Sequence, residues 1–318
     1  MPMPVTLPFA PRRILVGASD PEAVIAGLRT ARPDLEVRGG PHQTLTTDDV
    51  AWADVYVGFR RPPVAQMGAV RWVHSTGAGV DPWLVEGALA PEVLLTRSPQ
   101  SFGPAIAEWA LARLLAFTQR LPELAVAQQA RRWADPGVTR LAGTRALVLG
   151  TGDIGGAIAR LLGACGVSVT GVSRSGAATP GFDAVHPTAA LSTRVADADW
   201  IILALPDTPA TRGLVSRDVL ARCRGAVLLN AGRGAAVEEG ALPEALERGW
   251  LRGAALDVFV QEPLPVASPL WGDARVLVSP HCSGPTTVDG AVSGFLECLA
   301  TLERGVWPRW VIDRTKGY

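Results

Sequence analysis

Three side chains that could together bind a small anion and transfer a proton follow apolar segments in the second half of the chain. They are Arg233 in AGRGA, Glu262 in QEPLP and His281 in SPHCS. A guanidinium can bind a carboxylate in a bidentate manner, an imidazole titrates near neutral pH, and a neighbouring carboxylate favours the imidazolium. Taken singly, Arg233 would be a surface ion-pair partner and His281 a loop residue. Their chemistry therefore depends on whether the fold brings them together.

A glycine-rich turn in the middle of the chain has the form of a dinucleotide-binding fingerprint. It follows the apolar run ALVLG directly and opens an apolar helical segment. The first glycine suits a tight turn, the second lets backbone approach a pyrophosphate, and the third allows close packing of helix and strand. The helix N-terminus then faces the anion. We therefore expect cofactor binding by Gly150, Thr151, Gly152, Asp153, Ile154 and Gly155.

The residue that selects the cofactor should end the next apolar strand. An NAD site places an aspartate or glutamate about 20 residues after the glycines, where it binds the ribose 2′-hydroxyl. Here the strand ends with Ser173, Arg174 and Ser175, without a carboxylate. An arginine would pair with the 2′-phosphate of NADP, although a solvated loop arginine is the alternative. We therefore expect these three residues to contact the cofactor, with NADP(H) preferred and NAD(H) possible.

Short apolar runs alternate with helix-like segments, which is typical of parallel sheets covered on both faces. We expect strands at 13–17, 55–59, 71–75, 93–97, 146–150, 167–173, 200–206, 226–232, 253–259 and 276–281. Helical spacing of apolar residues over 98–121 predicts a connecting helix, and the Gly- and Pro-rich stretches 176–188 and 261–269 read as surface loops. Because ligands of such sheets bind beyond the carboxyl ends of the strands, Arg233, Glu262 and His281 can converge there.

Composition narrows the classes of partner. Lysine plus arginine and aspartate plus glutamate each number 30, so no net basic field exists to hold nucleic acid or an anionic membrane. Four cysteines without a C-x-x-C spacing argue against a disulfide framework or zinc site, and we expect no metal. The N-terminus lacks a signal-peptide pattern and no run of about 18 apolar residues occurs. We expect a cytoplasmic protein with a small-molecule substrate.

Several spaced motifs, in order, resemble the D-isomer-specific 2-hydroxyacid dehydrogenase family, and within it the glyoxylate/hydroxypyruvate reductase branch. The motifs are HSTGAGVD (74–81), AEWAL (107–111), LGTGDIGGAIARLL (149–162), LPDTPATRGLV (205–215), the run 228–265, SPHCSG (279–284) and VIDRTKGY (311–318). The resemblance implies NAD(P)H-dependent reduction of a small 2-oxo acid to the D-2-hydroxy acid by hydride transfer.

The resemblance also implies a role for individual residues. Arg233 would bind the substrate's carboxylate and keto oxygen, His281 would be the acid/base, and Glu262 would pair with His281. Asp257 would hold the nicotinamide carboxamide. A nest of backbone N–H groups for the substrate would come from Thr76, Gly77, Ala78 and Gly79. Further cofactor contacts would come from Leu205, Pro206, Thr211, Ala231 and Gly232.

The expected architecture is an α/β protein with two Rossmann- or flavodoxin-like, doubly wound parallel-sheet domains and an active-site cleft between them. Residues 98–284 would form the dinucleotide-binding domain, and 1–97 plus 285–318 the substrate-binding domain. By resemblance we also expect a homodimer, with segments 103–120 and 124–142 at the contact.

Two other functions stay open at this point. One is a formate- or phosphite-oxidising member of the superfamily, of which the phosphite type is weakened because Lys316 is the only lysine. The other is a dinucleotide-sensing scaffold or corepressor without turnover.

His74, directly before the nest, could touch the substrate. A core or interface position suits the tryptophans better than a pocket lining: Trp72, Trp83, Trp109 and Trp133.

Overall fold

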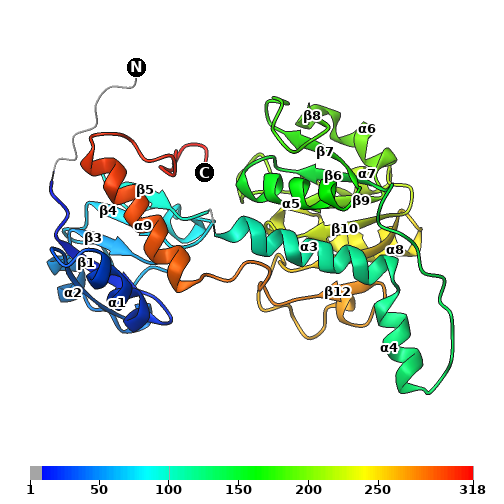
Figure 1. Ribbon diagram of the computed structural model, residues 1–318, viewed down its shortest axis with the longest axis horizontal. Coiled ribbons are helices and arrows are strands. Elements are labelled where there is room, and N and C mark those ends of the chain that lie inside the picture. The colour runs from blue at the N-terminus through cyan, green and yellow to red at the C-terminus, as the bar shows by residue number, and fades with distance from the viewer. Residues whose placement is uncertain (1–8, 100, 318) are drawn as a thin grey trace. The chain divides into compact units, whose positions relative to one another are not determined.

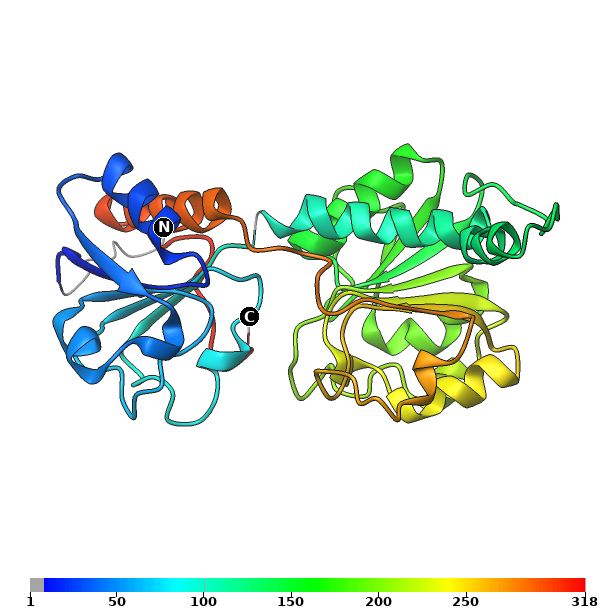
Figure 2. The ribbon, with the colours of Figure 1, turned by 90° about the horizontal axis from the view of Figure 1, so that it is seen from below.

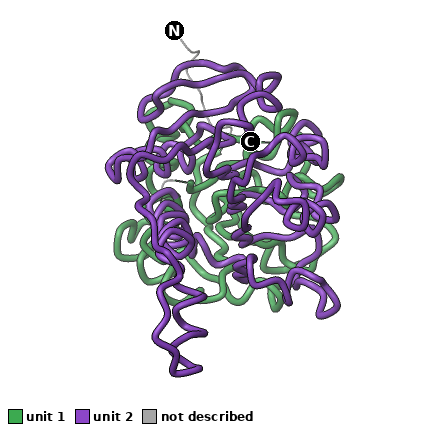
Figure 3. Tube along the Cα trace, turned by 90° about the vertical axis from the view of Figure 1, so that its right-hand side faces the viewer, with its two compact units in different colours: residues 1–102, 286–318 green, residues 103–285 purple. Residues whose placement is uncertain are grey.

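The computed structural model describes residues 9–99 and 101–317, which divide into two units (Figure 3). Unit 1 combines the chain up to Phe102 with the chain from Thr286 onward, and unit 2 is Gly103–Pro285. The first boundary therefore lies at residue 102, whereas the sequence placed it at 97. The physical reason is that Ser98 belongs to the interior of unit 1, where its Oγ lies 2.7 Å from Nε2 of His74.

Unit 1 is built on a five-stranded parallel sheet with the order β2-β1-β3-β4-β5, the flavodoxin-like order. The strands are β1 (Arg13–Gly17), β2 (Glu36–Gly40), β3 (Val55–Val57), β4 (Trp72–Ser75) and β5 (Leu94–Arg97). Its helices are α1 (Pro21–Ala31), α2 (Thr47–Trp52) and α9 (Val288–Glu303). Adjacent strand residues face opposite sides, so Ile14 packs in the cluster with α1 and α9 while Leu15 packs in the cluster with α2. Figures 1 and 2 show α1 and α9 side by side on one face.

Unit 2 contains a seven-stranded parallel sheet with the order β12-β11-β10-β9-β6-β7-β8. The strands are β6 (Arg145–Leu149), β7 (Ser168–Ser173), β8 (Ala184–Pro187), β9 (Trp200–Leu203), β10 (Ala226–Asn230), β11 (Leu251–Leu256) and β12 (Val276–Val278). The helices are α3 (Phe102–Thr118), α4 (Leu121–Gln129), α5 (Asp153–Ala164), α6 (Leu191–Arg194), α7 (Arg217–Leu220) and α8 (Leu242–Glu247). Figure 2 shows α3 and α5 over one face of this sheet and α8 against the other.

The strand order of unit 2 reverses between β6 and β9. At such a reversal the two connecting loops leave in opposite directions, which opens a crevice at the carboxyl ends of the strands where doubly wound sheets bind their ligands. The expected fold class, α/β with two parallel sheets, is therefore confirmed, and the glycine turn after β6 lies at the reversal.

Two edge strands differ from the sequence reading. β8 corrects the interpretation of 176–188 as a surface loop, because residues 184–187 pair in parallel with 170–173 of β7. Its side chains are only partly buried and it ends in a proline, which an edge strand tolerates because one side of it needs no ladder partner. β2, at the edge of the other sheet, was not among the expected strands, since a single buried valine gives no apolar run.

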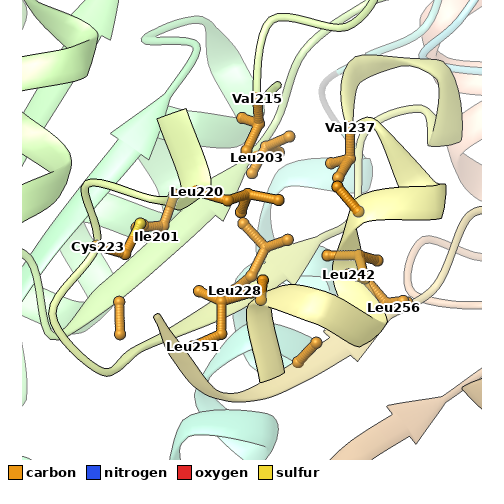
Figure 4. Close-up of a cluster of buried hydrophobic side chains, with 14 of the residues drawn as sticks. Ile201, Leu203, Val215, Leu220, Cys223, Leu228, Val237, Leu242, Leu251 and Leu256 are labelled. Atoms are coloured by element: carbon orange, nitrogen blue, oxygen red, sulfur yellow. The ribbon is translucent and has the colours of Figure 1, made fainter. Parts of the chain in front are cut away.

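The core of unit 2 is filled from neighbouring strands and the helices over them. Figure 4 shows Leu203, Leu228 and Leu256, from β9, β10 and β11, next to Val215, Val237 and Leu242. Burying a leucine side chain contributes about 1.5–3 kcal/mol. This packing fixes the spacing of the strand ends from which the loops of the candidate site emerge.

Residues 121–140, here called the arm, extend away from the sheet of unit 2 (Figures 1 and 3). The arm contains α4 and an irregular segment, and it exposes large apolar side chains: Leu121, Leu124, Val126, Trp133 and Val138. Within the described ranges, no helix combines the length and apolar character that a membrane crossing requires.

Candidate active site

The glycine turn has the geometry that the fingerprint requires. Gly150 has φ 99°, a conformation that side chains disfavour, and a Cβ there would lie 2.5 Å from the carbonyl oxygen of Ala204. A Cβ on Gly155 would lie 1.8 Å from the carbonyl oxygen of Gly150, so only glycine lets α5 approach β6 this closely. Packing within unit 2 therefore explains why the first and third positions of the fingerprint are glycine.

Gly152 is different, because a Cβ there would meet nothing within 4 Å. It is the N-cap of α5, and no side chain caps the helix at that point. The amides of the first helical turn have no partners within a helix and favour an anion. Open space at the glycine together with an uncapped helix start fits the pyrophosphate of a dinucleotide, and Thr151, Asp153 and Ile154 lie in the same turn.

The end of β7 carries no carboxylate among Ser173, Arg174 and Ser175. The Ser173 hydroxyl accepts a hydrogen bond from the amide of Gly176 at 3.1 Å, which shapes the turn, and Arg174 is exposed. Asp183 is occupied at the other end of the strand, where its Oδ2 accepts from Ser168 and from the amide of Val169. The structure therefore presents a cation, and not an acid, where an NAD site holds its aspartate.

A compact loop follows β9 and carries three of the expected cofactor contacts, Leu205, Pro206 and Thr211. The Thr211 hydroxyl donates to the carbonyl oxygen of Pro206 at 2.6 Å and accepts from the amide of Thr208 at 2.9 Å. At the edge of the loop, Asp207 forms an exposed ion pair with Arg212. The loop also approaches the β10 turn, since a Cβ on Gly232 would lie 2.7 Å from the backbone nitrogen of Leu205. The absence of a side chain at Gly232 therefore lets the loop after β9 pack against the turn after β10, which also contains Ala231.

Arg233 stands in a turn that is held by the side chain of Asn230, the last residue of β10. The Asn230 carboxamide accepts from the amide of Gly232 at 3.1 Å and donates to the carbonyl oxygen of Arg233 at 3.0 Å. The Arg233 Nη1 donates to the carbonyl oxygen of Gly232 at 2.7 Å. Sequence reasoning missed Asn230, although a polar residue at the end of an otherwise apolar strand is a signal for such a turn.

Glu262 and His281 form a pair. Nδ1 of His281 lies 2.8 Å from Oε2 of Glu262, and the other carboxylate oxygen accepts from the amide of Phe259 at 3.0 Å. With Nδ1 directed at the carboxylate, Nε2 is the nitrogen that remains to exchange a proton. Arg233, Glu262 and His281 follow β10, β11 and β12, which are adjacent parallel strands, so their loops leave the same edge of the sheet.

Asp257 has a structural task that the sequence did not reveal. Its buried carboxylate accepts hydrogen bonds from the Ser279 hydroxyl at 2.6 Å and from the amides of Cys282 and Ser283 at 3.0 and 2.8 Å. Burial raises the pKa of this carboxyl, but the hydrogen bonds outweigh it and hold the pKa below its usual value. The carboxylate therefore fastens the loop on both sides of His281. A contact with a nicotinamide carboxamide stays a prediction.

The expected nest lies in unit 1, directly after β4. The Ser75 hydroxyl donates to the carbonyl oxygen of Gly79 at 3.1 Å and accepts from the amide of Gly77 at 3.4 Å, and Arg97 donates to the carbonyl oxygen of Ala78 at 2.5 Å. Two carbonyls of the loop are thereby held by side chains. Among the described residues, the amides of Thr76, Ala78 and Gly79 have no hydrogen-bond acceptor within the chain. Binding of an anion by the four expected amides stays a prediction.

His74 does not touch a substrate, because it is fully buried beneath the nest. Its Nδ1 lies 2.7 Å from the Thr96 hydroxyl and its Nε2 2.7 Å from the Ser98 hydroxyl, and its ring packs edge-on against Phe295. Burial lowers its pKa from 6.5 to about 3. Trp72 and Trp83 are buried in the core of the same unit, as expected.

The lowered pKa of His74 predicts acid sensitivity of unit 1. The unfolded chain binds this proton below about pH 6.5 but the folded chain does not, so the contribution of His74 is complete above that pH and is lost as the pH falls. Between about pH 7.5 and pH 5 we expect the free energy of unfolding to fall by about 2 kcal/mol from this group. Denaturant titrations across this range measure it. His74→Asn should remove this component, and parallel pH dependence of the two proteins would contradict the prediction.

Cys282, next to His281, is exposed, and the other three cysteines are also free thiols. Within residues 9–99 and 101–317 no group of histidine, cysteine, aspartate and glutamate side chains could hold a metal ion.

Comparison with known proteins identifies relatives of this sequence. The model of the D-isomer specific 2-hydroxyacid dehydrogenase NAD-binding domain matches residues 111–283. The chain belongs to this family. A glyoxylate/hydroxypyruvate reductase A from Serratia proteamaculans is 34% identical over 310 residues, covering 93% of this chain and 96% of the relative.

Solved structures of D-isomer specific 2-hydroxyacid dehydrogenases have the same fold. The Aeromonas salmonicida family member superposes with a TM-score of 0.87 at 33% identity, covering 96% of this chain and 100% of the other. The Xanthobacter autotrophicus dehydrogenase, in complex with NADPH and MES, gives 0.86 at 31% identity, with 98% and 100% coverage. The NADPH-dependent glyoxylate/hydroxypyruvate reductase from Sinorhizobium meliloti, in complex with NADP and sulfate, gives 0.85 at 29%, with 96% and 100% coverage.

Family membership establishes the class of reaction. As a member of the D-isomer specific 2-hydroxyacid dehydrogenases, the protein is an NAD(P)-dependent oxidoreductase, and the expectation of such an enzyme is confirmed.

Proposed function

We propose that this dehydrogenase reduces a small 2-oxo acid of the glyoxylate or hydroxypyruvate type to the D-2-hydroxy acid, with NADPH as the preferred reductant. The observation that carries the proposal is the Glu262–His281 pair, at 2.8 Å, in a loop adjacent to that of Arg233. The pair can deliver a proton and the guanidinium can bind a carboxylate. The Serratia and Sinorhizobium proteins, named as glyoxylate/hydroxypyruvate reductases, support the substrate class.

The cofactor, when bound, supplies the hydride that the keto carbon receives. Its pyrophosphate would be held by the glycine turn at 150–155 and its 2′-phosphate by Arg174 with Ser173 and Ser175. The remaining contacts would come from Leu205, Pro206, Thr211, Ala231, Gly232 and Asp257.

The residues of this chain then bind the acid and move the proton. Arg233 binds the substrate's carboxylate and keto oxygen. That the amides of Thr76, Gly77, Ala78 and Gly79 also bind the carboxylate stays a prediction. The imidazolium of His281 donates Nδ1–H to Glu262 and transfers the proton on Nε2 to the keto oxygen as negative charge develops there. His281 is left neutral and recovers a proton from solvent. The keto acid thus gains one hydride and one proton.

A substrate panel tests the proposal. We expect the purified protein to oxidise NADPH with glyoxylate and hydroxypyruvate, more slowly with 2-oxo acids that carry larger side chains, and to yield the D-enantiomer from hydroxypyruvate. Calorimetry with NADPH alone measures cofactor binding in the same preparation. Cofactor binding without turnover of any 2-oxo acid would overturn the proposal in favour of a dinucleotide-sensing scaffold.

Cofactor selection predicts a specific effect of Arg174. Because a charge-assisted hydrogen bond contributes about 1.5–3 kcal/mol, Arg174→Ser should lower the ratio of kcat/KM for NADPH to that for NADH by about 10- to 100-fold. The matched control is Arg194→Ser, which removes another exposed arginine from unit 2 and should leave the ratio unchanged. Equal kcat/KM values for the two cofactors in the unaltered enzyme would rule out the assignment.

The proposal includes a homodimer with segments 103–120 and 124–142 at the contact, of which the second overlaps the arm. Trp133 is 106% exposed relative to a reference tryptophan, and four further large apolar side chains of the arm are exposed. Large exposed apolar side chains in one segment are consistent with an interaction site. Sedimentation equilibrium should give twice the mass of the chain, and a monomeric mass at micromolar concentration would contradict the dimer.

A further inference from the structure

A chain of hydrogen bonds leads from the middle of α3 to the loop that carries His281. It begins at Trp109, whose indole Nε1 donates to the Ser279 hydroxyl at 3.2 Å. The Ser279 hydroxyl in turn donates to Oδ1 of Asp257 at 2.6 Å. Trp109 and Ser279 are 8% and 5% exposed, so water does not compete readily for either bond. All three residues lie in unit 2.

The direction of this chain is fixed by the chemistry of its first member. An indole N–H can donate but cannot accept. A serine hydroxyl rotates and can donate in several directions, so a donor that occupies its oxygen restricts where its single proton can point. With Trp109 donating to Ser279, the serine proton is directed to Asp257. Trp109 therefore orients the Ser279 hydroxyl toward Asp257, although Trp109 lies in α3 and not in the His281 loop.

Asp257 connects this chain to the position of the imidazole. Its carboxylate accepts from the amides of Cys282 and Ser283, and its carbonyl oxygen accepts from the amide of His281 at 2.7 Å. His281 has φ 51°, a left-handed conformation that is unfavourable for a residue with a side chain. The backbone of His281 therefore keeps this conformation only while the surrounding bonds hold it, and the conformation aims Nδ1 at Glu262.

We propose that Trp109 and Ser279 are positioning residues of the reductase, which act through Asp257 to hold the His281 loop in the geometry for proton transfer. This inference rests on the proposed role of His281 as the acid. The ring of Trp109 also packs in the core and lies 5.1 Å from the Arg113 guanidinium, so its removal would disturb packing as well. A test must therefore separate the N–H group from the ring.

The protein contains a closely matched control for that separation. Trp200 in β9 is 1% exposed, and its Nε1 donates to the Thr144 hydroxyl at 2.8 Å, which itself donates to the carbonyl oxygen of Leu141 at 2.6 Å. This is the same sequence of indole, hydroxyl and oxygen acceptor in the same unit. Thr144 directly precedes β6, so the control lies at the amino end of the parallel strands, opposite to the His281 loop.

The experiment compares Trp109→Phe with Trp200→Phe, each of which keeps a ring and loses the N–H. We expect both variants to lower Tm by similar amounts. Only Trp109→Phe should lower kcat for glyoxylate with NADPH, by about 3- to 10-fold as for the loss of one hydrogen bond, with KM for NADPH little changed. It should also speed amide hydrogen exchange in the peptide covering 279–284, a measurement that needs neither substrate nor turnover.

Ser279 variants test whether Trp109 acts through the hydroxyl. Ser279→Ala should lower kcat at least as far as Trp109→Phe, whereas Ser279→Thr, which keeps the hydroxyl, should recover most of the loss. In the Ser279→Ala background, Trp109→Phe should cause no further loss of kcat, because residues in one network are not additive.

The possible outcomes separate this inference from the function on which it rests. If His281→Ala keeps full activity, the proposed acid is wrong. If His281→Ala is inactive but Trp109→Phe has the kcat and the exchange of Trp200→Phe, only the positioning role is overturned. Additive losses of kcat in the double variant would likewise overturn it, because Trp109 would then act by another route.

Discussion

Replacing His281 by alanine is expected to lower kcat for glyoxylate reduction by about 10²- to 10⁴-fold. The imidazole is the group whose Nδ1 is held by Glu262 at 2.8 Å and whose other nitrogen can deliver a proton. Without it, the developing alkoxide must take its proton from water, because a guanidinium such as that of Arg233 stabilises its charge but does not readily give up a proton. Stopped-flow measurement of NADPH oxidation under single-turnover conditions reports this step directly.

The adjacent residue provides the control for this substitution. Cys282→Ser changes an exposed side chain one position away and leaves the amide that donates to Asp257 in place, so its rate should stay close to that of the unaltered enzyme. Glu262→Gln should fall between the two, since a neutral amide gives a weaker hydrogen bond to Nδ1 of His281 than a carboxylate does. Near-normal turnover of the alanine variant would exclude His281 as the proton donor.

Replacing Arg233 by alanine is expected to lower kcat/KM for glyoxylate by about 10²- to 10⁴-fold. Two charge-assisted hydrogen bonds of about 1.5–3 kcal/mol each are lost with the guanidinium. Arg233→Lys keeps the charge but not the planar fork, so it should lose about 10- to 100-fold, as for one of the two bonds. Steady-state kinetics over a range of glyoxylate concentrations separates the loss in KM from that in kcat.

Arg217 provides the matched control for the substitutions of Arg233. It binds Glu244 through Nε and Nη2, both at 2.7 Å, so it is also a bidentate partner of a carboxylate, but within the protein surface. Arg217→Lys should therefore leave kcat/KM unchanged. Equal activity of the Arg233 and Arg217 variants would show that the guanidinium of Arg233 does not bind the substrate.

The sheets were largely predictable from the sequence, and the errors fall at the ends of strands and at two sheet edges. The apolar runs at 200–206, 226–232 and 253–259 extend past the ends of β9, β10 and β11 at 203, 230 and 256. Each strand ends before its apolar run does, because the residues that follow, such as Gly232 and Asp257, make loop contacts instead of strand pairs. Apolar periodicity does not reveal such contacts. The edge strands β2 and β8 were missed because an edge needs little burial.

The candidate site was predictable as a set of residue types but not as a network. Arg233, Glu262 and His281 could be placed at one sheet edge because parallel strands end together. The carboxylate of Asp257, by contrast, fastens a loop through backbone amides, which leave no pattern in the side-chain sequence. The position of His74 before the nest left contact with the substrate open, and the structure shows the side chain buried between two hydroxyls.

Unit 2 is inserted between two parts of unit 1, and this arrangement sets the order in which the cores can form during synthesis. Phe295, Cys298 and Leu299 of α9 fill one face of the unit 1 sheet, and Phe295 stacks on Trp72 at 5.0 Å. A ribosome makes these residues only after all of unit 2 has been made. During synthesis the sheet of unit 1 therefore has only α1 on this face, and lacks the cover of α9, until all of unit 2 has been made.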